Sequence, residues 1–426
     1  MNTPTECQPN RPMLSRRALK YFRRVADWVI GIVTRHRFAV GYGVIALTSL
    51  FLIPSFNAGV QGDLALYHGI ARDLLNGELP YRDRILEYPP YAIPIFSLPR
   101  IFGGDGYFLA FMGMAFLADA IIKMLLLVIG LRRSTTARGL LPVLSYSLAV
   151  PFIHFFYLQR YDVWPALICL LALWLFSSRR PLLCGLAIAV GIGAKVYPAV
   201  FVPPLFALAV RQGKGRRFVA GLVAGLLPVV LLSLVLPWWR FAQFQGARGL
   251  QCESFYASLL WFGSLLGLPG VTWASARAWQ EVQGPSALAV LPWARALSVA
   301  MVCASTALAT WAAARVETLS VSKTARLLLL PLLAFVIFNV VLSPQFMIWL
   351  LPLAALGSLD GNPSAMLAIP LATALTPIFF PCPEYSTGLN PWETIILLLR
   401  NLMLIGTWTM LTAEVISALR GKSRAW

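Results

Sequence analysis

The chain has 426 residues, of which 58% are hydrophobic and only 12% are charged. Because a soluble domain carries about 25% charged residues, this composition excludes a disordered chain, argues against a soluble enzyme and predicts a polytopic membrane protein. The formal net charge of +18 would suit a nucleic-acid partner, but the basic residues occur in short bursts between apolar runs, as at Arg132-Arg133 and Arg179-Arg180. Such bursts are typical of topology determinants, so no nucleic acid is expected as a partner.

Residues 1–37 form a polar and basic N-terminal segment. Within it, Tyr21, Val25, Trp28 and Ile32 recur at helical spacing, and basic residues lie on the opposite face. This pattern predicts an interfacial helix on an anionic cytoplasmic leaflet. The basic region that precedes the first apolar run is too long for a signal peptide.

Residues 38–419 alternate between apolar runs and short polar segments, which we interpret as one transmembrane domain. A span needs about 20 apolar residues, and fewer where helices pack within protein. The predicted fold is all-α, with about twelve transmembrane helices and short outer-loop helices. The predicted spans are Phe38–Phe56, Tyr107–Gly130, Leu140–Tyr157, Val163–Phe176, Leu182–Ala194, Val196–Val210, Phe218–Pro237, Leu288–Ala314, Leu327–Leu342, Phe346–Leu359, Ser364–Phe380 and Thr394–Leu419.

The run from Leu182 to Val210 has basic loops on both sides, so it must cross the membrane twice. We therefore expect a hairpin of two helices with a break near Lys195, where the sequence reads Gly193-Ala194-Lys195-Val196-Tyr197-Pro198. Proline lacks a backbone donor and disfavours helix in the residue before it.

The loops that share a side with the N-terminus hold most of the 35 Lys and Arg residues. This bias predicts a multi-pass cell-membrane protein whose termini are cytoplasmic, including a short tail at residues 420–426. Two segments on the outer side are long: residues 57–106, called here the first long loop, and residues 238–287, the second long loop. Both are rich in aromatic and charged residues, and such loops on a rigid scaffold often carry function.

The first long loop offers a carboxylate, Asp63, at the start of an amphipathic helix that Gly77 closes. One interpretation is an N-cap, because an aspartate often accepts hydrogen bonds from the first backbone N–H groups of a helix. The other is a general base that takes a proton from a hydroxyl group at the membrane surface. The two roles are compatible.

Farther along this loop, Glu87-Tyr88-Pro89-Pro90-Tyr91 places acidic and aromatic side chains on an extended backbone. Glu87 and Tyr91 are therefore candidates for substrate contact. The alternative is an interfacial belt, in which tyrosine and tryptophan side chains lie at the depth of the lipid headgroups.

The loop sequence GDLALYHGIARDLLNGELPYRDRILEYPPYAIPIFSLP, which starts at Gly62, resembles the first outer loop of glycosyltransferase family 87. That family belongs to the type C, polyprenyl-phosphate-dependent membrane glycosyltransferases and includes mycobacterial phosphatidylinositol mannosyltransferases. Shorter matching pieces lie between the expected spans, in the same order as in the family. They are Gln159-Arg160-Tyr161-Asp162, Lys195-Val196-Tyr197-Pro198, Glu253-Ser254, and Ser343-Pro344-Gln345-Phe346 followed by Trp349.

The resemblance implies transfer of a hexose, with mannose favoured, from a polyprenyl-phosphate donor to an outer-leaflet lipid or glycan acceptor. Direct displacement of the phosphate would invert the anomeric centre of the sugar. Asp63 matches the catalytic base of the family, and the active site would face outward. The matched pieces make Tyr197, Glu253 and Gln345 further candidates for substrate binding. Some mannosyltransferases of the family have a histidine in a late outer loop; here the histidines are His36, His68 and His154, so another residue must fill that role or it stays unfilled.

A polyprenyl-phosphate sugar already has a good leaving group, so the chemistry needs no nucleotide, only a base and cations around the departing phosphate. No cofactor is expected, and the sequence shows no clear metal site. The candidate cations are Lys195, Arg248 and Arg160. Each has a simpler alternative role: Lys195 can snorkel to the interface, Arg248 can lie in a solvated loop, and Arg160 can pair with Asp162 across a turn.

The main rival function is a secondary transporter or lipid flippase, which would need ionisable residues along a path through the membrane midplane. Asp119 and Lys123 lie four residues apart inside an expected span, and we interpret them as a structural ion pair, with a proton relay as the alternative. A non-catalytic assembly subunit is a third reading, because a fold can persist after activity is lost.

Overall fold

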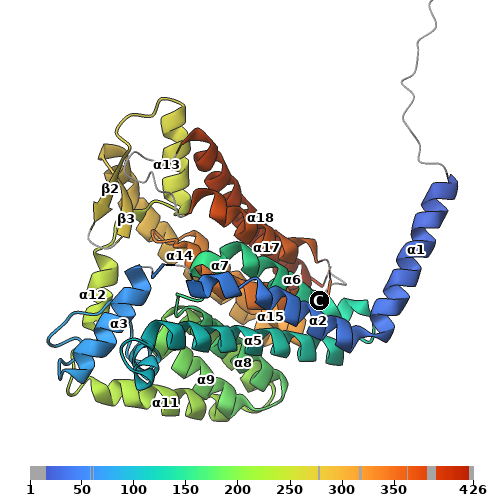
Figure 1. Cartoon of the computed structure of the whole chain (residues 1–426), viewed down its shortest axis with the longest axis horizontal. Helices are drawn as coiled ribbons and strands as arrows, with labels where there is room; N and C mark the ends of the chain where they lie inside the picture. The colour runs from blue at the N-terminus through green and yellow to red at the C-terminus, as the bar shows by residue number, and fades with distance from the viewer. Residues whose placement is uncertain are drawn as a thin grey trace, which may run out of the picture.

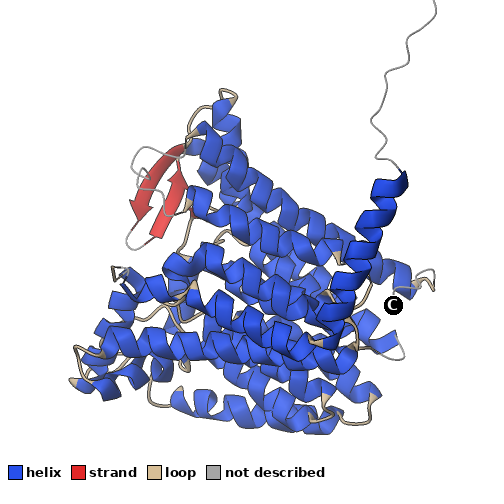
Figure 2. Ribbon diagram, turned by 45° about the vertical axis from the view of Figure 1, so that its right-hand side comes forward, coloured by secondary structure: helices blue, strands red, loops and turns tan. Residues whose placement is uncertain are grey.

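A computed structural model describes residues 16–57, 59–60, 62–276, 279–315, 319–361, 363–380 and 390–421. The structure is 77% helical, with one small sheet at a corner of the helical bundle (Figure 2). In Figure 1, α3 (Gly62–Leu75) of the first long loop and α12 (Arg240–Gly246) of the second lie at one end of the bundle. Helix α1 (Arg16–Arg35) and the C-terminus lie at the opposite end. The fold therefore gathers both long loops on one side.

A helix occupies each of the apolar runs expected from the sequence. These helices are α2 (Arg37–Leu50), α5 (Tyr107–Arg133), α6 (Leu141–Ala149), α8 (Val163–Ser177), α9 (Pro181–Ala194), α10 (Val202–Arg211), α11 (Gly215–Leu232), α14 (Pro285–Arg315), α15 (Val321–Ile337), α16 (Met347–Gly357), α17 (Ser364–Phe379) and α18 (Pro391–Leu419). The mostly helical character of the fold is thus confirmed.

Within the described residues, six of these segments are long and apolar enough to cross a membrane. They are Arg37–Asn57, Tyr107–Arg133, Ala137–Tyr157, Gly215–Leu232, Pro285–Arg315 and Pro391–Leu419. Other helices, such as α9 with 14 residues and α16 with 11, are too short to span a bilayer alone. The number of about twelve spans therefore stays a prediction.

The predicted break at Lys195 is confirmed. Helix α9 ends at Ala194, and Lys195 takes an extended conformation with φ −154° and ψ 139°. The chain then forms a 3₁₀ turn, η5 (Tyr197–Phe201), before α10 begins. Because Pro198 has no backbone N–H, the turn cannot continue the hydrogen-bond pattern of α9.

Helix α9 is held by close packing on α11. A Cβ atom at Gly185 would collide with the backbone carbonyl of Phe218, and one at Gly221 would collide with that of Leu182. Glycine is therefore needed on both helices for the backbones to approach this closely, as at many interfaces between membrane helices. This contact fixes the helix whose end carries Lys195.

The second long loop contains a sheet, which corrects the all-α prediction. Strands β1 (Leu250–Gln251), β2 (Thr272–Ala276) and β3 (Trp279–Gln283) are antiparallel in the order β1-β3-β2. The buried side chains of Leu250 and Val282 lie opposite each other in the register. Strands of two to five residues are too short for a sequence pattern to reveal. The sheet is stabilised by burial of this apolar cross-strand pair, which the local sequence does not indicate.

A buried ion pair within α5 ties this helix to its neighbours. Asp119 and Lys123 approach to 2.8 Å, and neither side chain is exposed to solvent. The hydroxyl groups of Tyr146 and Tyr157 donate to Asp119 Oδ1 at 3.1 and 3.0 Å, and Lys123 Nζ donates to Ser49 Oγ at 3.1 Å. The predicted pairing is confirmed, and it links α5 to α2, α6 and α7 (His154–Tyr157).

The N-terminal helix α1 extends away from the bundle (Figures 1 and 2). The side chains of Trp28 and Ile30 on it are 67% and 52% exposed. The helix agrees with the amphipathic pattern of the sequence, and its contact with a lipid surface stays a prediction. Residues 422–426 of the expected cytoplasmic tail lie outside the described residues.

Candidate functional site

A four-residue turn between α7 and α8 lies at the centre of the candidate site. We call this segment, Gln159-Arg160-Tyr161-Asp162, the QRYD turn. Its first residue reaches the first long loop, because Gln159 Nε2 donates to the backbone oxygen of Gly59 at 3.1 Å. The next three residues contact three further parts of the site.

Asp63, the candidate base, forms an ion pair with Arg160. The structure corrects the N-cap interpretation: α3 begins at Gly62, so Asp63 lies within its first turn. A carboxylate there still interacts favourably with the helix dipole. The Asp63 side chain is 35% exposed, compared with 10% for Arg160. The carboxylate is therefore open to solvent on one side and held by a guanidinium on the other.

Lys195 is held by a buried carboxylate instead of extending to the interface. Its Nζ lies 2.8 Å from Oδ1 of Asp162, and the Trp349 indole Nε1 donates to the same oxygen at 2.7 Å. The Asp162 side chain is fully buried, and that of Lys195 is 18% exposed. The expected alternative, a pair between Arg160 and Asp162, is not the arrangement observed, because each residue has a different partner.

The ammonium group of Lys195 also lies over aromatic rings. Nζ is 4.4 Å from the ring centre of Tyr161 and 5.0 Å from that of Trp349, and Phe346 lies at 6.0 Å. Such contacts attract a cation through the negative face of the ring. We call these three residues the Lys195 cage. The Lys195 side chain is 18% exposed, so its partners do not enclose it completely.

Tyr161 also packs the first long loop onto the QRYD turn. Its ring meets Tyr67, Tyr88 and Phe96 edge-on, with centroid distances of 5.7, 5.3 and 5.2 Å. Tyr67 stacks on Phe96 at 4.3 Å. Edge-to-face and offset ring pairs of this kind stabilise a core beyond simple burial. Because this cluster includes Tyr67 on α3, it fixes the helix that carries Asp63.

The two long loops are joined by another ion pair. Arg248 Nη2 lies 2.9 Å from Glu87 Oε2, and both side chains are largely buried. Gln245 on α12 adds a hydrogen bond to the backbone oxygen of Glu87 at 3.2 Å. The candidates Glu87 and Arg248 are therefore brought together, and the second long loop is positioned beside the first.

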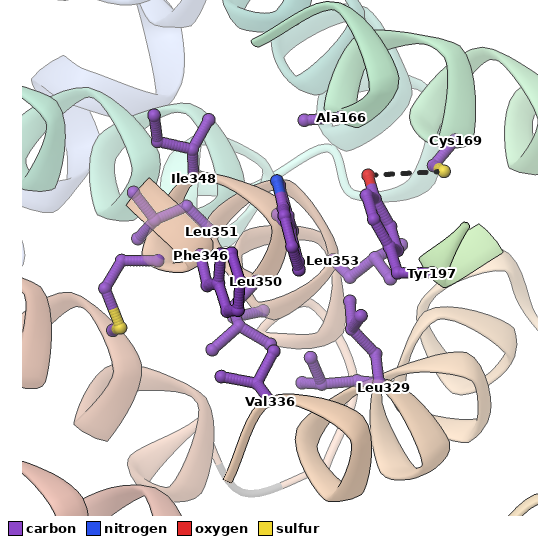
Figure 3. Packing of buried hydrophobic residues seen from close by; sticks show 14 of the residues in the cluster. Ala166, Cys169, Tyr197, Leu329, Val336, Phe346, Ile348, Leu350, Leu351 and Leu353 are labelled. Atoms are coloured by element: carbon purple, nitrogen blue, oxygen red, sulfur yellow. Dashed lines mark hydrogen bonds between the residues drawn. The ribbon is translucent and has the colours of Figure 1, made fainter. Parts of the chain in front are cut away.

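Tyr91 and Tyr197 mainly hold structural elements in place. The Tyr91 hydroxyl donates to Gly225 O at 2.6 Å, and its backbone N–H donates to Gly193 O at 2.7 Å, which docks the first long loop on α9 and α11. Tyr197 is 1% exposed and stacks on Trp349 at 4.4 Å. Its oxygen accepts from Cys169 Sγ at 3.5 Å, the dashed contact in Figure 3. The structure places Tyr197 behind the Lys195 cage, away from the site surface.

Glu253 and Gln345 lie farther from the QRYD turn in the network of contacts. Glu253 is 2% exposed, and its backbone oxygen accepts from Arg400 and Asn401 of α18 at 3.1 and 3.4 Å. Gln345 is half-buried in η6 (Pro344–Phe346), where its Oε1 accepts from Ser343 Oγ. Gln345 therefore borders the Lys195 cage through its neighbour Phe346, and Glu253 connects the second long loop to α18.

Burial keeps the titratable groups of the turn in defined states. It lowers the pKa of Arg160 to about 10, an effect that the Asp162 carboxylate opposes, so the guanidinium stays charged near neutral pH. Burial raises the pKa of Tyr161, and the carboxylates of Asp162 and Glu87 add to this shift, so the phenol stays neutral. The charges of the site are thus paired: Asp63 with Arg160, Asp162 with Lys195, and Glu87 with Arg248.

Binding roles for Asp162, Tyr161 and Trp349 were not predicted from the sequence. Two signals were present, because Asp162 and Tyr161 lie in the matched piece that contains Arg160, and Trp349 closely follows Gln345. Within the part of the chain that the structure describes, no three His, Cys, Asp or Glu side chains form a metal-binding group.

A largely helical, apolar chain with three ion pairs on and near the QRYD turn defines a membrane protein with a candidate site at one end of its helical bundle. The model of glycosyltransferase family 87 matches residues 86–344. This match covers more than half of the chain and contains the QRYD turn, Lys195 and Arg248, whereas Asp63 precedes it. The chain therefore belongs to glycosyltransferase family 87 and is a glycosyltransferase. No curated protein matches it.

Proposed function

We propose that this protein transfers a hexose, with mannose favoured by the resemblance, from a polyprenyl-phosphate donor to a lipid or glycan acceptor. The reaction takes place at the outer face of the cell membrane, and both termini are cytoplasmic. The observation that carries this proposal is the QRYD turn, which holds the carboxylate of Asp63 and the ammonium of Lys195 at one end of the bundle. A base and a cation are the two groups that displacement of a sugar from a phosphate requires.

In this proposal, Asp63 accepts the proton of the acceptor hydroxyl group. The acceptor oxygen then forms a bond to C1 of the sugar while the bond between C1 and the phosphate oxygen breaks. The electron pair of that bond leaves with the polyprenyl phosphate. Direct displacement inverts the configuration at C1. General-base catalysis of this kind contributes about 10²- to 10⁴-fold to the rate.

Cations near the leaving phosphate stabilise the negative charge that develops on it. We assign this role to Lys195 and Arg248, whose side chains are partly exposed at the loop end of the bundle. Arg160 pairs with Asp63, so we assign it to the base and not to the donor phosphate. A guanidinium beside a carboxylate favours its ionised form, which is the form that accepts a proton.

The transporter alternative has less support from the placement of charge. A transport path needs polar groups through the middle of the bundle. The described ion pair at mid-bundle, Asp119–Lys123, is fully buried and hydrogen-bonded to Tyr146, Tyr157 and Ser49. The other described ion pairs lie on the long loops and the QRYD turn, except Arg326–Glu414, which joins α15 to α18 beside Gly357 and Asp360.

The test is sugar transfer from a polyprenyl-phosphate hexose by purified protein carrying Asp63→Asn. This change removes the base and keeps the size of the side chain, so turnover should fall by roughly a hundredfold or more. The control is Asp73→Asn on the same helix, which breaks pairs with Arg72 and Arg84 and should leave turnover near normal. Melting curves must show that both variants are folded. Near-normal turnover by Asp63→Asn would reject Asp63 as the base.

A further inference from the structure

Asp162 occupies the N-cap position of α8, but its carboxylate does not cap the helix. No backbone N–H of α8 donates to this side chain in the described structure. An aspartate at this position normally accepts such a bond, which stabilises the start of the helix. Here Oδ1 accepts from Lys195 and Trp349 instead. The Asp162 carboxylate therefore binds Lys195 at the end of α9 instead of the backbone N–H groups of α8.

The partners of Lys195 lie on the protein side of its ammonium group. The carboxylate of Asp162 is fully buried and lies on the protein side of the ammonium group. The rings of Tyr161 and Trp349 flank the same nitrogen. An ammonium group has three N–H donors, and the hydrogen bond to Asp162 uses one of them. The exposed 18% of the Lys195 side chain is the part that an incoming anion can reach.

The backbone limits the freedom of Lys195 further. Its N–H still bonds to Gly191 O at 2.8 Å, so the residue is attached to the last turn of α9. The C-terminal end of a helix is a favourable place for a cation, because the helix dipole is negative there. Lys195 thus has a fixed backbone, and Asp162 fixes the far end of its side chain.

We propose that Asp162 is a positioning residue, which holds the Lys195 ammonium group toward the phosphate of the donor and is itself oriented by the Trp349 indole. This inference rests on the proposed role of Lys195. Its physical basis is preorganisation: a cation that is already in place and charged does not need to be ordered when the donor binds. Asp162 itself does not touch the substrate.

The alternative, that Asp162 is the base, conflicts with the geometry. Its side chain is fully buried, and Oδ1 already accepts two hydrogen bonds. An acceptor hydroxyl group must come within hydrogen-bond distance of a base, and Asp63 offers such access whereas Asp162 does not.

The first experiment measures Lys195 directly, without activity. The full-length protein is treated in detergent micelles with an amine-reactive ester at one fixed pH, and the labelling of Lys195 relative to Lys214 is quantified by mass spectrometry. Lys214 hydrogen-bonds to the Arg179 carbonyl far from the site and serves as an internal reference. Asp162→Asn should raise this ratio roughly tenfold, because the amide no longer binds the ammonium group. Trp349→Phe, which removes one hydrogen bond to Asp162, should raise it less.

The second experiment separates the donor from the acceptor in steady-state kinetics. Asp162→Asn should lower kcat/KM for the donor roughly tenfold to a hundredfold and leave the KM of the acceptor unchanged. The double variant with Lys195→Met should be no worse than Lys195→Met alone, because both changes remove the same contact. Asp73→Asn is the matched control for loss of a carboxylate.

Two results would overturn the inference: an unchanged Lys195 labelling ratio in Asp162→Asn, or losses that add in the double variant. A separate arm tests the proposed function by adding an isoprenyl monophosphate, which should protect Lys195 from labelling in the wild-type protein. Absence of protection, together with a raised ratio in Asp162→Asn, would reject the phosphate contact and support the coupling of Asp162 to Lys195. The two failures are therefore distinguishable.

Discussion

Removing one charge of the Asp119–Lys123 pair should destabilise the protein much more than removing both. Neither side chain is exposed, so a single change leaves an uncompensated charge inside the bundle. Breaking a buried pair in this way costs about 3–5 kcal/mol, whereas replacing both partners is often neutral. We therefore expect Lys123→Met and Asp119→Asn each to lower the free energy of unfolding by roughly this amount.

The double variant Asp119→Asn/Lys123→Met should recover most of the loss. The asparagine keeps an acceptor for the hydroxyl groups of Tyr146 and Tyr157, which donate to Asp119 Oδ1 in the native protein. The two hydroxyl oxygens lie 2.5 Å apart, so one hydroxyl group can donate to the other instead of to residue 119, and neither is left without a partner. The remaining cost is the lost bond from Lys123 to Ser49, about 1 kcal/mol.

The assay is a denaturant titration of the wild-type protein, the two single variants and the double variant in mixed micelles, with sugar transfer measured on the same samples. A structural pair predicts unstable single variants and a double variant that is stable and active. A double variant that is as stable as the wild-type protein but inactive would refute this reasoning and favour a proton relay. Single variants as stable as the wild-type protein would refute the expected loss of about 3–5 kcal/mol in the free energy of unfolding.

Three further predictions concern other parts of the molecule. Gly193→Ala should destabilise the protein by about 1–3 kcal/mol in melting experiments, because its methyl group would collide with the Tyr91 ring, and Tyr91→Ala should relieve the effect. Burial, together with the charges of Arg100 and Arg72, lowers the pKa of His68 below 6.5. As the pH decreases through about 6.5, the unfolded chain therefore binds a proton before the folded protein does, and the free energy of unfolding should fall. Melting experiments at pH 5.5 and 7.5 should show this loss of stability in the wild-type protein and a smaller loss in His68→Asn. In cells, on a background without other cysteines, a cysteine at Glu78 should react with an impermeant reagent from outside, and one at Gly215 should react only after permeabilisation.

The helices were predictable from the sequence because each depends on local composition. The break at Lys195 followed from Pro198 and from the basic loops on both sides of the hairpin, and it lies where it was expected. The sheet was not predictable, because β1 and β3 are brought together from either side of α13 (Phe255–Leu265). Pairing between distant strands is decided by tertiary packing, which a short window of sequence does not contain.

The candidate residues were found more readily than their partners. Asp63, Lys195 and Arg160 stand out as charges near the ends of apolar runs, so their positions could be read from the sequence. Which carboxylate meets which cation depends on residues that are far apart: Asp162 lies 33 residues from Lys195 and 187 from Trp349. The local expectation, a pair between Arg160 and Asp162, failed because a tight turn points the two side chains toward different elements.

Because the side chains of Arg160 and Asp162 point toward different elements, one short turn can position groups for both proposed substrates. Within the QRYD turn, Arg160 reaches the carboxylate of Asp63, and Asp162 reaches Lys195. Tyr161 lies between them and packs against both α3 and the Lys195 cage. In the proposed mechanism, the distance between the base Asp63 and the cation Lys195 is therefore set largely by one peptide segment. Because a misplacement of about 1 Å can cost a hundredfold in rate, coupling both groups to one turn would preserve the proposed geometry of transfer.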